Sequence, residues 1–430
     1  MQTRRGLWIA ALLALILLEG MAFRAAVGGD WYAGGNDMGY ILTECRKATG
    51  KDVAGWLTGS WIGHEIFTYY RPVTSLAMYG EYRLFGERSA PWQALSLCLH
   101  MGSTLMLALL CRRLFRSATA GWVGAAVWGF RDRMLGAIQW TPAQTDMLAG
   151  FFALLALLTL KLYLDGRKWF WLPISSAAAL LAMASKEVAL ILPALATLLV
   201  LHAPGIPRRS KAALIGGAWL IAAAFVAWRL HALGGLGFLP GQPVPRTAAR
   251  VRNTMAPIEV GGLAHRLLAF LLPTPVGPST SINMLAVWAA AATAAGVLLA
   301  SRRGRERLAW AVLAGGFLLV TFLLDGLDGW AWWLLPNTYW QLFIGVLALW
   351  LMVLAVGRRP KDCLLLLGWG IAVWLPLYHV VYNVAGNVTY LPETYWGLAW
   401  ACLTAAVTLP LPAKAEAEAP PALTVGEISG

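Results

Sequence analysis

Apolar runs of about 20 residues recur along this chain, and they restrict its possible fold more than any other feature of the sequence. The runs at residues 7–27 and 90–110 are two of them. Each is long enough to cross the roughly 30 Å hydrocarbon core of a bilayer as a helix, and none alternates like a strand of an outer-membrane barrel. With 59% hydrophobic and 13% charged residues, the chain carries more apolar surface than a water-soluble domain buries. We therefore predict an all-α, polytopic integral membrane protein.

Hydrophobicity divides the chain into twelve predicted spans, of which the third and the fifth are short. The spans lie at residues 7–27, 90–110, 119–131, 142–164, 169–185, 187–203, 211–230, 284–300, 307–324, 338–356, 363–380 and 394–412. We expect residues 1–412 to form a single transmembrane domain. The tail at 413–430 is rich in Ala, Glu and Pro, and we expect it to be disordered and cytoplasmic.

Basic residues gather in short clusters between the apolar runs. The clusters lie at residues 4–5, 112–116, 167–168, 208–211, 302–307 and 358–361. With twelve spans they all fall on one side, so the positive-inside rule places both termini in the cytoplasm, and it places the first loop, 28–89, and the long connector 231–283 outside. The net charge of +13 then reflects membrane orientation, and we expect no nucleic-acid partner.

The first run follows Arg4 and Arg5 and continues to about Val27, so we expect an uncleaved signal-anchor rather than a cleaved signal peptide. Glu19 lies inside this run. A functional role is one interpretation, but contact with a hydrogen-bond partner on a neighbouring helix is the favoured explanation for a carboxylate at that depth.

The first outer loop concentrates ionisable side chains in an otherwise apolar chain. Asp30 and Asp37 lie just beyond the first span, where a carboxylate is suited to deprotonate an acceptor hydroxyl at the membrane surface. Solvated loop acids that cap short interfacial helices explain the same two residues. Arg71 follows Tyr69 and Tyr70, and its guanidinium is suited either to bidentate phosphate binding or to anchoring on lipid headgroups.

Two polar groups interrupt later apolar stretches. Residues 141–144 (TPAQ) have the form of a helix start, with Thr141 as the N-cap and Asp146 in the first turn, where its charge suits the helix dipole. Together with Asp132, these residues are candidates to line an outward-facing polar cavity. Lys186 and Glu187 separate two runs at the same outer side, where Lys186 is either a phosphate ligand or part of a tight interhelical turn.

Four short motifs, in this order, resemble the polytopic GT-C glycosyltransferases that use polyprenyl-phosphate sugars, and in particular the bacterial relatives of the TPR-containing O-mannosyltransferases. The motifs are residues 35–40 (GNDMGY), 70–76 (YRPVTSL) followed by 82–86 (YRLFG), 144–149 (QTDMLA) and 181–187 (LAMASKE). The likeness covers residues 1–205. The later half matches mainly at Tyr390.

The resemblance implies a membrane glycosyltransferase of the bacterial inner membrane with its site on the extracytoplasmic face. It implies inverting transfer from a polyprenyl-phosphate-linked sugar to a glycan, lipid or protein acceptor. In that scheme Asp37 is the general base, with Asp30 as second choice, and Arg71, Lys186 and Tyr70 bind the donor phosphate.

The remaining site residues in this scheme order the cavity, the acceptor or a divalent ion. They are Asp132, Gln144, Asp146, Glu187 and Tyr390. A divalent cation is therefore possible, although the chain shows no His/Cys/Asp cluster with ligand spacing. Membrane lipids are the other expected partners.

Several features depart from the family pattern. Asn36 stands where relatives pair two acids, Arg131 and Asp132 stand where many carry His-Pro, and no TPR array follows the last span. Two other classes remain open, namely a polysaccharide polymerase or ligase and a non-catalytic lipid or polysaccharide transporter. A polymerase typically carries its large outer loop late in the chain, whereas here that loop follows the first span. A transporter needs a polar path across the whole membrane.

Overall fold

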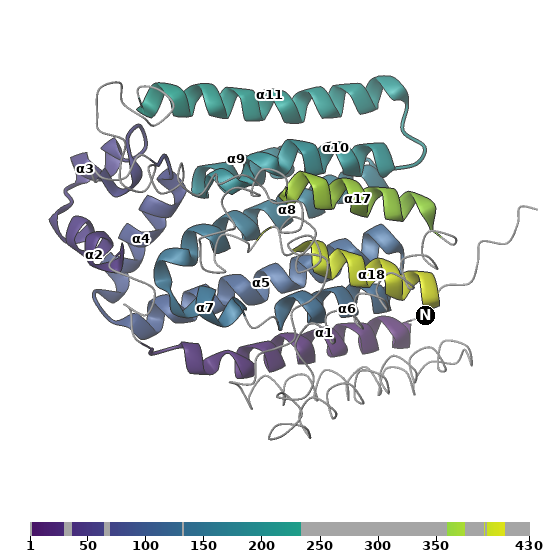
Figure 1. Cartoon of the computed structure of the whole chain (residues 1–430), viewed down its shortest axis with the longest axis horizontal. Helices are drawn as coiled ribbons and strands as arrows, with labels where there is room; N and C mark the ends of the chain where they lie inside the picture. The colour runs from purple at the N-terminus through teal and green to yellow at the C-terminus, as the bar shows by residue number, and fades with distance from the viewer. Residues whose placement is uncertain are drawn as a thin grey trace, which may run out of the picture.

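A computed structural model describes residues 2–29, 37–63, 69–130, 133–233, 359–374, 391 and 394–408 (Figure 1). Every regular element in these ranges is a helix, and they contain no strand. The prediction of an all-α protein is confirmed for this part of the chain. The predicted connector 231–283 beyond Leu233, the predicted spans 284–300, 307–324 and 338–356, and the tail lie outside the described residues.

Four of the described helical segments are long and apolar enough to cross a membrane, namely Gly6–Ala26, Ser89–Phe115, Thr141–Gly166 and Arg208–Leu233. They correspond to most of α1 (Gln2–Ala22) with η1 (Arg24–Ala26), to α5 (Ser89–Phe115), to η3 (Thr141–Ala143) with α8 (Gln144–Gly166), and to α11 (Arg208–Leu233). The predicted apolar spans at 7–27, 90–110, 142–164 and 211–230 are thus helical, as a membrane-embedded protein requires. The total of twelve spans stays a prediction.

Shorter helices lie alongside the long ones (Figure 1). They are α6 (Ala118–Gly129), α7 (Arg133–Gln139), α9 (Trp171–Ser185), η4 (Glu187–Ile191), α10 (Leu192–His202), α17 (Pro360–Trp374) and α18 (Thr394–Thr408). With 12 residues, α6 is only about 18 Å long and cannot cross a 30 Å hydrocarbon core by itself. It is packed instead between α5 and α18.

Small residues let α6 and α18 approach closely. A Cβ atom on Gly124 would lie 2.7 Å from the carbonyl oxygen of Gly397, and a Cβ on Gly397 would lie 2.6 Å from that of Gly124. Backbones in such contact are typical of helix pairs in membranes, where packing replaces the hydrophobic effect. Trp128 and Trp369 are fully buried in the core around them.

The predicted first loop is largely helical. It contains α2 (Asp37–Lys47), α3 (Gly50–Gly55), η2 (Trp61–Gly63) and α4 (Pro72–Phe85), which gather at one end of the bundle (Figure 1). These elements share an apolar core that includes Met38, Ile41, Trp56 and Met78. The apolar residues of α2 recur at helical spacing and cover one face, so the segment is a small helical cap rather than an open polar loop.

The two ends of α8 contact different parts of the structure. At its carboxyl end Asp165 accepts from Arg113 of α5 at 3.4 Å, and nearby Arg359 donates to the carbonyl of Phe115 at 3.2 Å. The basic ends of α5, α8 and α17 therefore meet at one end of the bundle. The helical cap packs against the opposite end of α8, through α2 on η3 and α4 on α8.

Glu19 has the helix–helix contacts that its depth predicts. Thr104 of α5 donates to Glu19 Oε1 at 2.6 Å, and His100 Nε2 lies 2.8 Å from the same oxygen. A Cβ on Gly129 would come within 2.9 Å of that oxygen, so α6 also closes on this group. The expectation of a partner on a neighbouring helix is confirmed.

Candidate functional site

Arg71 joins the helical cap to the transmembrane bundle. It immediately precedes α4, whose first position is taken by Pro72, a residue preorganised for a helix start. The Arg71 side chain is buried, and its Nε and Nη2 donate to Glu187 Oε2 at 3.0 and 2.7 Å. The guanidinium also lies over the Tyr69 ring, 4.2 Å from its centroid, and 5.3 Å from that of Trp61, which favours a retained positive charge.

Lys186 lies beside this pair, in the break between α9 and η4. α9 ends at Ser185, and the extended backbone of Lys186 (φ −160°, ψ 147°) turns the chain into η4. Lys186 Nζ donates to Asp146 Oδ2 at 2.5 Å. The hydroxyl of Thr74 on α4 donates to the carbonyl of Ser185 at 2.8 Å, which fixes the break against the cap. Lys186 is thus both part of an interhelical turn and a member of a charged cluster.

Four buried oxygen atoms, on Glu187 and at the start of α8, have no hydrogen-bond partner among the described residues. They are Asp146 Oδ1, Glu187 Oε1, Gln144 Oε1 and Thr141 Oγ1. A buried polar atom without a partner costs roughly 1–3 kcal/mol. Several such atoms at one place indicate that water or a ligand supplies the missing hydrogen bonds.

Asp37 begins α2 and is half-buried. Burial raises the pKa of its carboxyl above the ordinary value, and the positive charge of Arg71 opposes that rise. Asp37 therefore lies within electrostatic reach of the cluster. A carboxylate with a raised pKa is a stronger base than one in free solution, which suits proton abstraction.

Glu81 of α4 is a member of the site that the sequence reasoning missed. It is 4% exposed, and Gln144 Nε2 donates to its Oε2 at 3.1 Å. Burial raises its pKa to about 8, with the hydrogen bond from Gln144 acting in the opposite direction. The spacing of Thr74, Met78 and Glu81 marks one helical face, and all three are buried. This spacing is the sequence feature that could have identified Glu81 as a buried residue.

Tyr70 is engaged elsewhere. Its hydroxyl donates to the carbonyl of Leu57 at 2.8 Å and accepts from Trp228 Nε1 at 2.7 Å. The side chain therefore ties the helical cap to the end of α11. Its assignment to the donor phosphate stays a prediction.

The predicted capping role of Thr141 is wrong. Residues 141–143 form a 3-10 turn in front of α8, and no side-chain cap is made at either start. The tight turn satisfies its first amides from backbone carbonyls, as in the 2.8 Å bond from Ala143 N to Trp140 O, so the hydroxyl is not needed there. Three other predicted site residues, Asp30, Asp132 and Tyr390, lie outside the described residues.

The described ranges contain no group of three or more His, Cys, Asp or Glu residues placed to hold a metal ion. The four buried oxygens are hard ligands of the kind that Mg²⁺ or Ca²⁺ takes, but two of the surrounding carboxylates already bind Arg71 and Lys186. A divalent cation stays a prediction.

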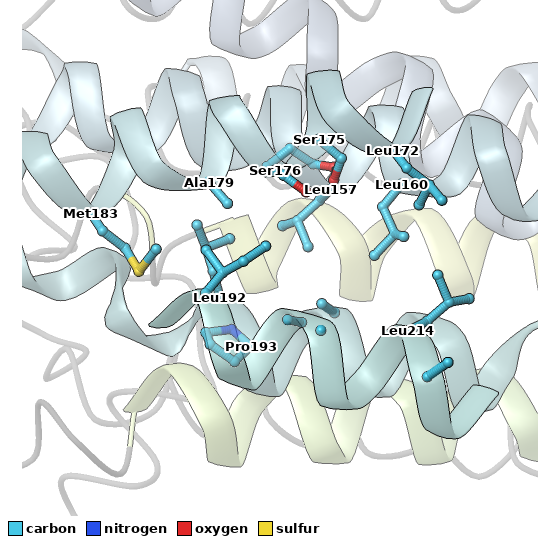
Figure 2. A pocket seen from close by; sticks show the side chains of 16 residues that line it. Leu157, Leu160, Leu172, Ser175, Ser176, Ala179, Met183, Leu192, Pro193 and Leu214 are labelled. Carbon is cyan, nitrogen blue, oxygen red and sulfur yellow. The ribbon is translucent and has the colours of Figure 1, made fainter. Parts of the chain in front are cut away.

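An apolar cavity of about 230 Å³ lies between α8, α9, α10 and α11 (Figure 2). Leu157, Leu172 and Leu192 are among its lining residues. Ser175 and Ser176 also line it, and Ser175 donates to the carbonyl of Ala156 at 2.8 Å. Met183, three residues before Lys186, lines one part of it. The cavity is therefore adjacent in sequence to the charged cluster.

Comparison of the chain with protein families, with curated proteins and with solved structures finds no match. The candidate site is therefore defined by its own geometry. Glu187 holds Arg71 and Asp146 holds Lys186, and four buried oxygens are available to a ligand. Asp37 lies within electrostatic reach of Arg71.

Proposed function

We propose that this protein is an inverting membrane glycosyltransferase that moves a sugar from a polyprenyl-phosphate-linked donor to an extracytoplasmic acceptor. The observation that supports it best is the meeting of Arg71 and Lys186. They come from segments far apart in the sequence, yet both are largely buried in one cluster at the end of the bundle, with Asp37 within electrostatic reach.

Each cation has a role in this proposal. Asp146 and Glu187 hold Lys186 and Arg71 in place and neutralise them while no ligand is bound, because two buried like charges alone are costly. A donor phosphate brings new acceptors for both cations. Arg71 offers a planar fork for two phosphate oxygens, and Lys186 a compact charge.

The transfer step follows from these positions. Asp37 takes the proton of the acceptor hydroxyl while the hydroxyl oxygen forms a bond to the anomeric carbon of the sugar. The bond from that carbon to the phosphate oxygen breaks, and its electron pair stays on the phosphate. Arg71 and Lys186 stabilise the charge that develops there, which is the electrostatic role that contributes most in such reactions.

Charge distribution supports an extracytoplasmic site. The basic ends of α5, α8 and α17 meet at the end of α8 opposite to Asp146. By the positive-inside rule that basic end faces the cytoplasm. The cluster then faces outward, and a twelve-span inner-membrane protein with both termini cytoplasmic accommodates it.

A binding titration tests the proposal directly. The purified full-length protein is titrated with citronellyl phosphate, a short prenyl phosphate, and with citronellol, which lacks the phosphate. We expect binding of the phosphate alone, and loss of that binding in Arg71→Ala. Arg46→Ala is the matched control, because Arg46 is an exposed arginine of the same cap that pairs with Glu87. Equal binding of both probes would contradict the proposal.

A genetic comparison separates this proposal from the alternatives. Deletion of a transferase that consumes a lipid-linked monosaccharide should raise the pool of that lipid-linked sugar relative to the wild-type strain. A polymerase or ligase consumes longer lipid-linked glycans, so its deletion raises those instead. A transporter does not catalyse sugar transfer, so membranes purified from its deletion strain should keep normal transfer activity.

A further inference from the structure

Glu81 and Gln144 form a buried polar contact that the transfer step above does not use. The two side chains are 4% and 0% exposed, and they come from α4 and α8, 63 residues apart. Glu81 Oε2 accepts from Gln144 Nε2 at 3.1 Å. The contact therefore fixes one end of the Gln144 carboxamide against the helical cap.

The other end of the carboxamide is available to a ligand. Gln144 Oε1 is buried without a partner among the described residues, as are Thr141 Oγ1 and Asp146 Oδ1 on the same start of α8. A carbonyl and a carboxylate oxygen can only accept hydrogen bonds. They suit a ligand that brings donors, and sugar hydroxyls are donors whereas a phosphate dianion is not.

The protonation state of Glu81 decides which end of Gln144 faces the ligand. An ionised carboxylate only accepts, so the amide nitrogen must point to Glu81 and the amide oxygen must point away. A protonated carboxyl can either accept through its carbonyl oxygen or donate to the amide oxygen, so it no longer holds the carboxamide in one orientation. The two orientations have nearly the same shape, so the choice depends on hydrogen bonding.

We propose that Glu81 is a positioning residue that, when ionised, turns the Gln144 carboxamide so that its oxygen accepts a hydroxyl of the transferred sugar. This inference rests on the proposed function and extends it to the sugar part of the donor. Arg71 and Lys186 bind the phosphate, and the Glu81–Gln144 pair distinguishes a sugar-bearing lipid phosphate from a bare one.

The surroundings of Glu81 make its ionisation responsive near neutral pH. Burial raises the pKa of Glu81 to about 8. Of the described titratable residues on the elements packed against α4, Cys45 of α2 interacts with the charge of Glu81, while Asp146 of α8 and Lys186 after α9 are the nearest charged residues of the cluster in sequence to Gln144 and Glu187. Asp146 and Lys186 are paired with each other. A ligand that needs ionised Glu81 lowers its pKa on binding, so sugar-dependent affinity rises with pH and a proton is released.

The test compares two kinds of probe on the full-length protein at pH 6.5 and pH 9. One probe is citronellyl phosphate, and the others are citronellyl phosphates carrying mannose, glucose or galactose. The measured quantity is the ratio of their dissociation constants, which isolates the contribution of the sugar. We expect at least one sugar to tighten binding at pH 9, on the order of threefold to tenfold for one buried hydrogen bond, and to lose most of that gain at pH 6.5.

Two variants and one control identify the residues. Glu81→Gln should give a sugar ratio that no longer changes with pH, and Gln144→Leu should bring the ratio close to one at both pH values. Because Gln144→Leu leaves Glu81 in place, the test does not depend on how Glu81→Gln folds. Glu87→Gln removes an exposed carboxylate two residues beyond α4 and should keep the wild-type response.

The outcomes are distinct. Three results would overturn this inference while leaving phosphate binding intact. They are a sugar ratio that still changes with pH in Glu81→Gln, a wild-type ratio in Gln144→Leu, and no sugar effect in the wild type at pH 9. Failure of citronellyl phosphate itself to bind the wild type would overturn the proposed function, and this inference with it.

Discussion

Arg71 and Glu187 are 116 residues apart, and the guanidinium of one donates two hydrogen bonds, 3.0 and 2.7 Å long, to a single carboxylate oxygen of the other. The second oxygen of Glu187 is buried without a partner among the described residues. The pair is therefore rigid on one side and open on the other. The open position is a carboxylate oxygen, which suits water or a ligand that brings a hydrogen-bond donor.

Arg71→Lys should weaken binding of citronellyl phosphate by about tenfold or more. Lysine keeps the charge but loses the planar fork, and charge-assisted hydrogen bonds contribute about 1.5–3 kcal/mol each. Titration of the variant measures the change, with Arg46→Lys as the control. An unchanged dissociation constant would show that Arg71 does not contact the phosphate.

Lys186→Met should destabilise the protein by about 3–5 kcal/mol, because it leaves the carboxylate of Asp146 buried and unpaired. The double variant Lys186→Met/Asp146→Asn removes both charges and should recover most of that loss in a thermal unfolding assay. Citronellyl phosphate should bind weakly to both. Recovery of binding in the double variant would assign Lys186 a structural role only.

The loss of binding in Lys186→Met and in Arg71→Ala should not be additive when the changes are combined. Both residues would serve one phosphate, and residues that share a partner are coupled. A double-mutant cycle on the dissociation constant of citronellyl phosphate measures this coupling. Strict additivity would mean that the two cations act on different groups.

Asp37→Asn should abolish sugar transfer while retaining binding of the donor. Asparagine keeps the size and the hydrogen bonding of aspartate but cannot take a proton. Since burial raises the pKa of Asp37, the wild-type rate should begin to fall at a higher pH than a solvent-exposed aspartate would give, as acid protonates the base. Normal turnover in Asp37→Asn, together with an inactive Asp30→Asn, would move the role to Asp30.

Stability should fall as pH rises toward 8, and Glu81 should account for part of the fall. Its folded pKa, about 8, lies above the ordinary value, so folding favours the protonated form. The resulting stabilisation is complete below the ordinary pKa of a glutamate, near 4.3, and is lost as the pH passes through 8. Unfolding temperatures of the wild type and Glu81→Gln, measured from pH 5 to 9, should converge in acid and separate in base.

The sequence predicts most of the helices and many of the buried charges, because both depend on local patterns. An apolar run of 20 residues has few alternatives to a helix in lipid. For the same reason Glu19, Asp146 and Lys186 are conspicuous, since an ionisable group there needs a partner. Their partners are a matter of helix packing. Nothing in the sequence pairs Lys186 with Asp146 40 residues before it.

Glu81 was missed for a different reason. Residues 28–89 are polar on average, and a polar segment next to a membrane is taken for a solvated loop. The cap buries its own core, so the average polarity of the segment does not show which side chains are buried. The helical spacing of Thr74, Met78 and Glu81 does indicate a buried face. Thr141 shows the limit of capping patterns, because a 3-10 turn takes over the amides that its hydroxyl was expected to bind.

The contact between Gly124 and Gly397 has a consequence for biosynthesis. α6 is too short to be a stable span by itself, and one of the helices that cover it, α18, begins only at Thr394. During synthesis, α6 leaves the ribosome long before α18 has been translated. A nascent chain arrested before α18 therefore exposes an unfilled face of α6, which the insertion machinery or lipid must cover until translation ends.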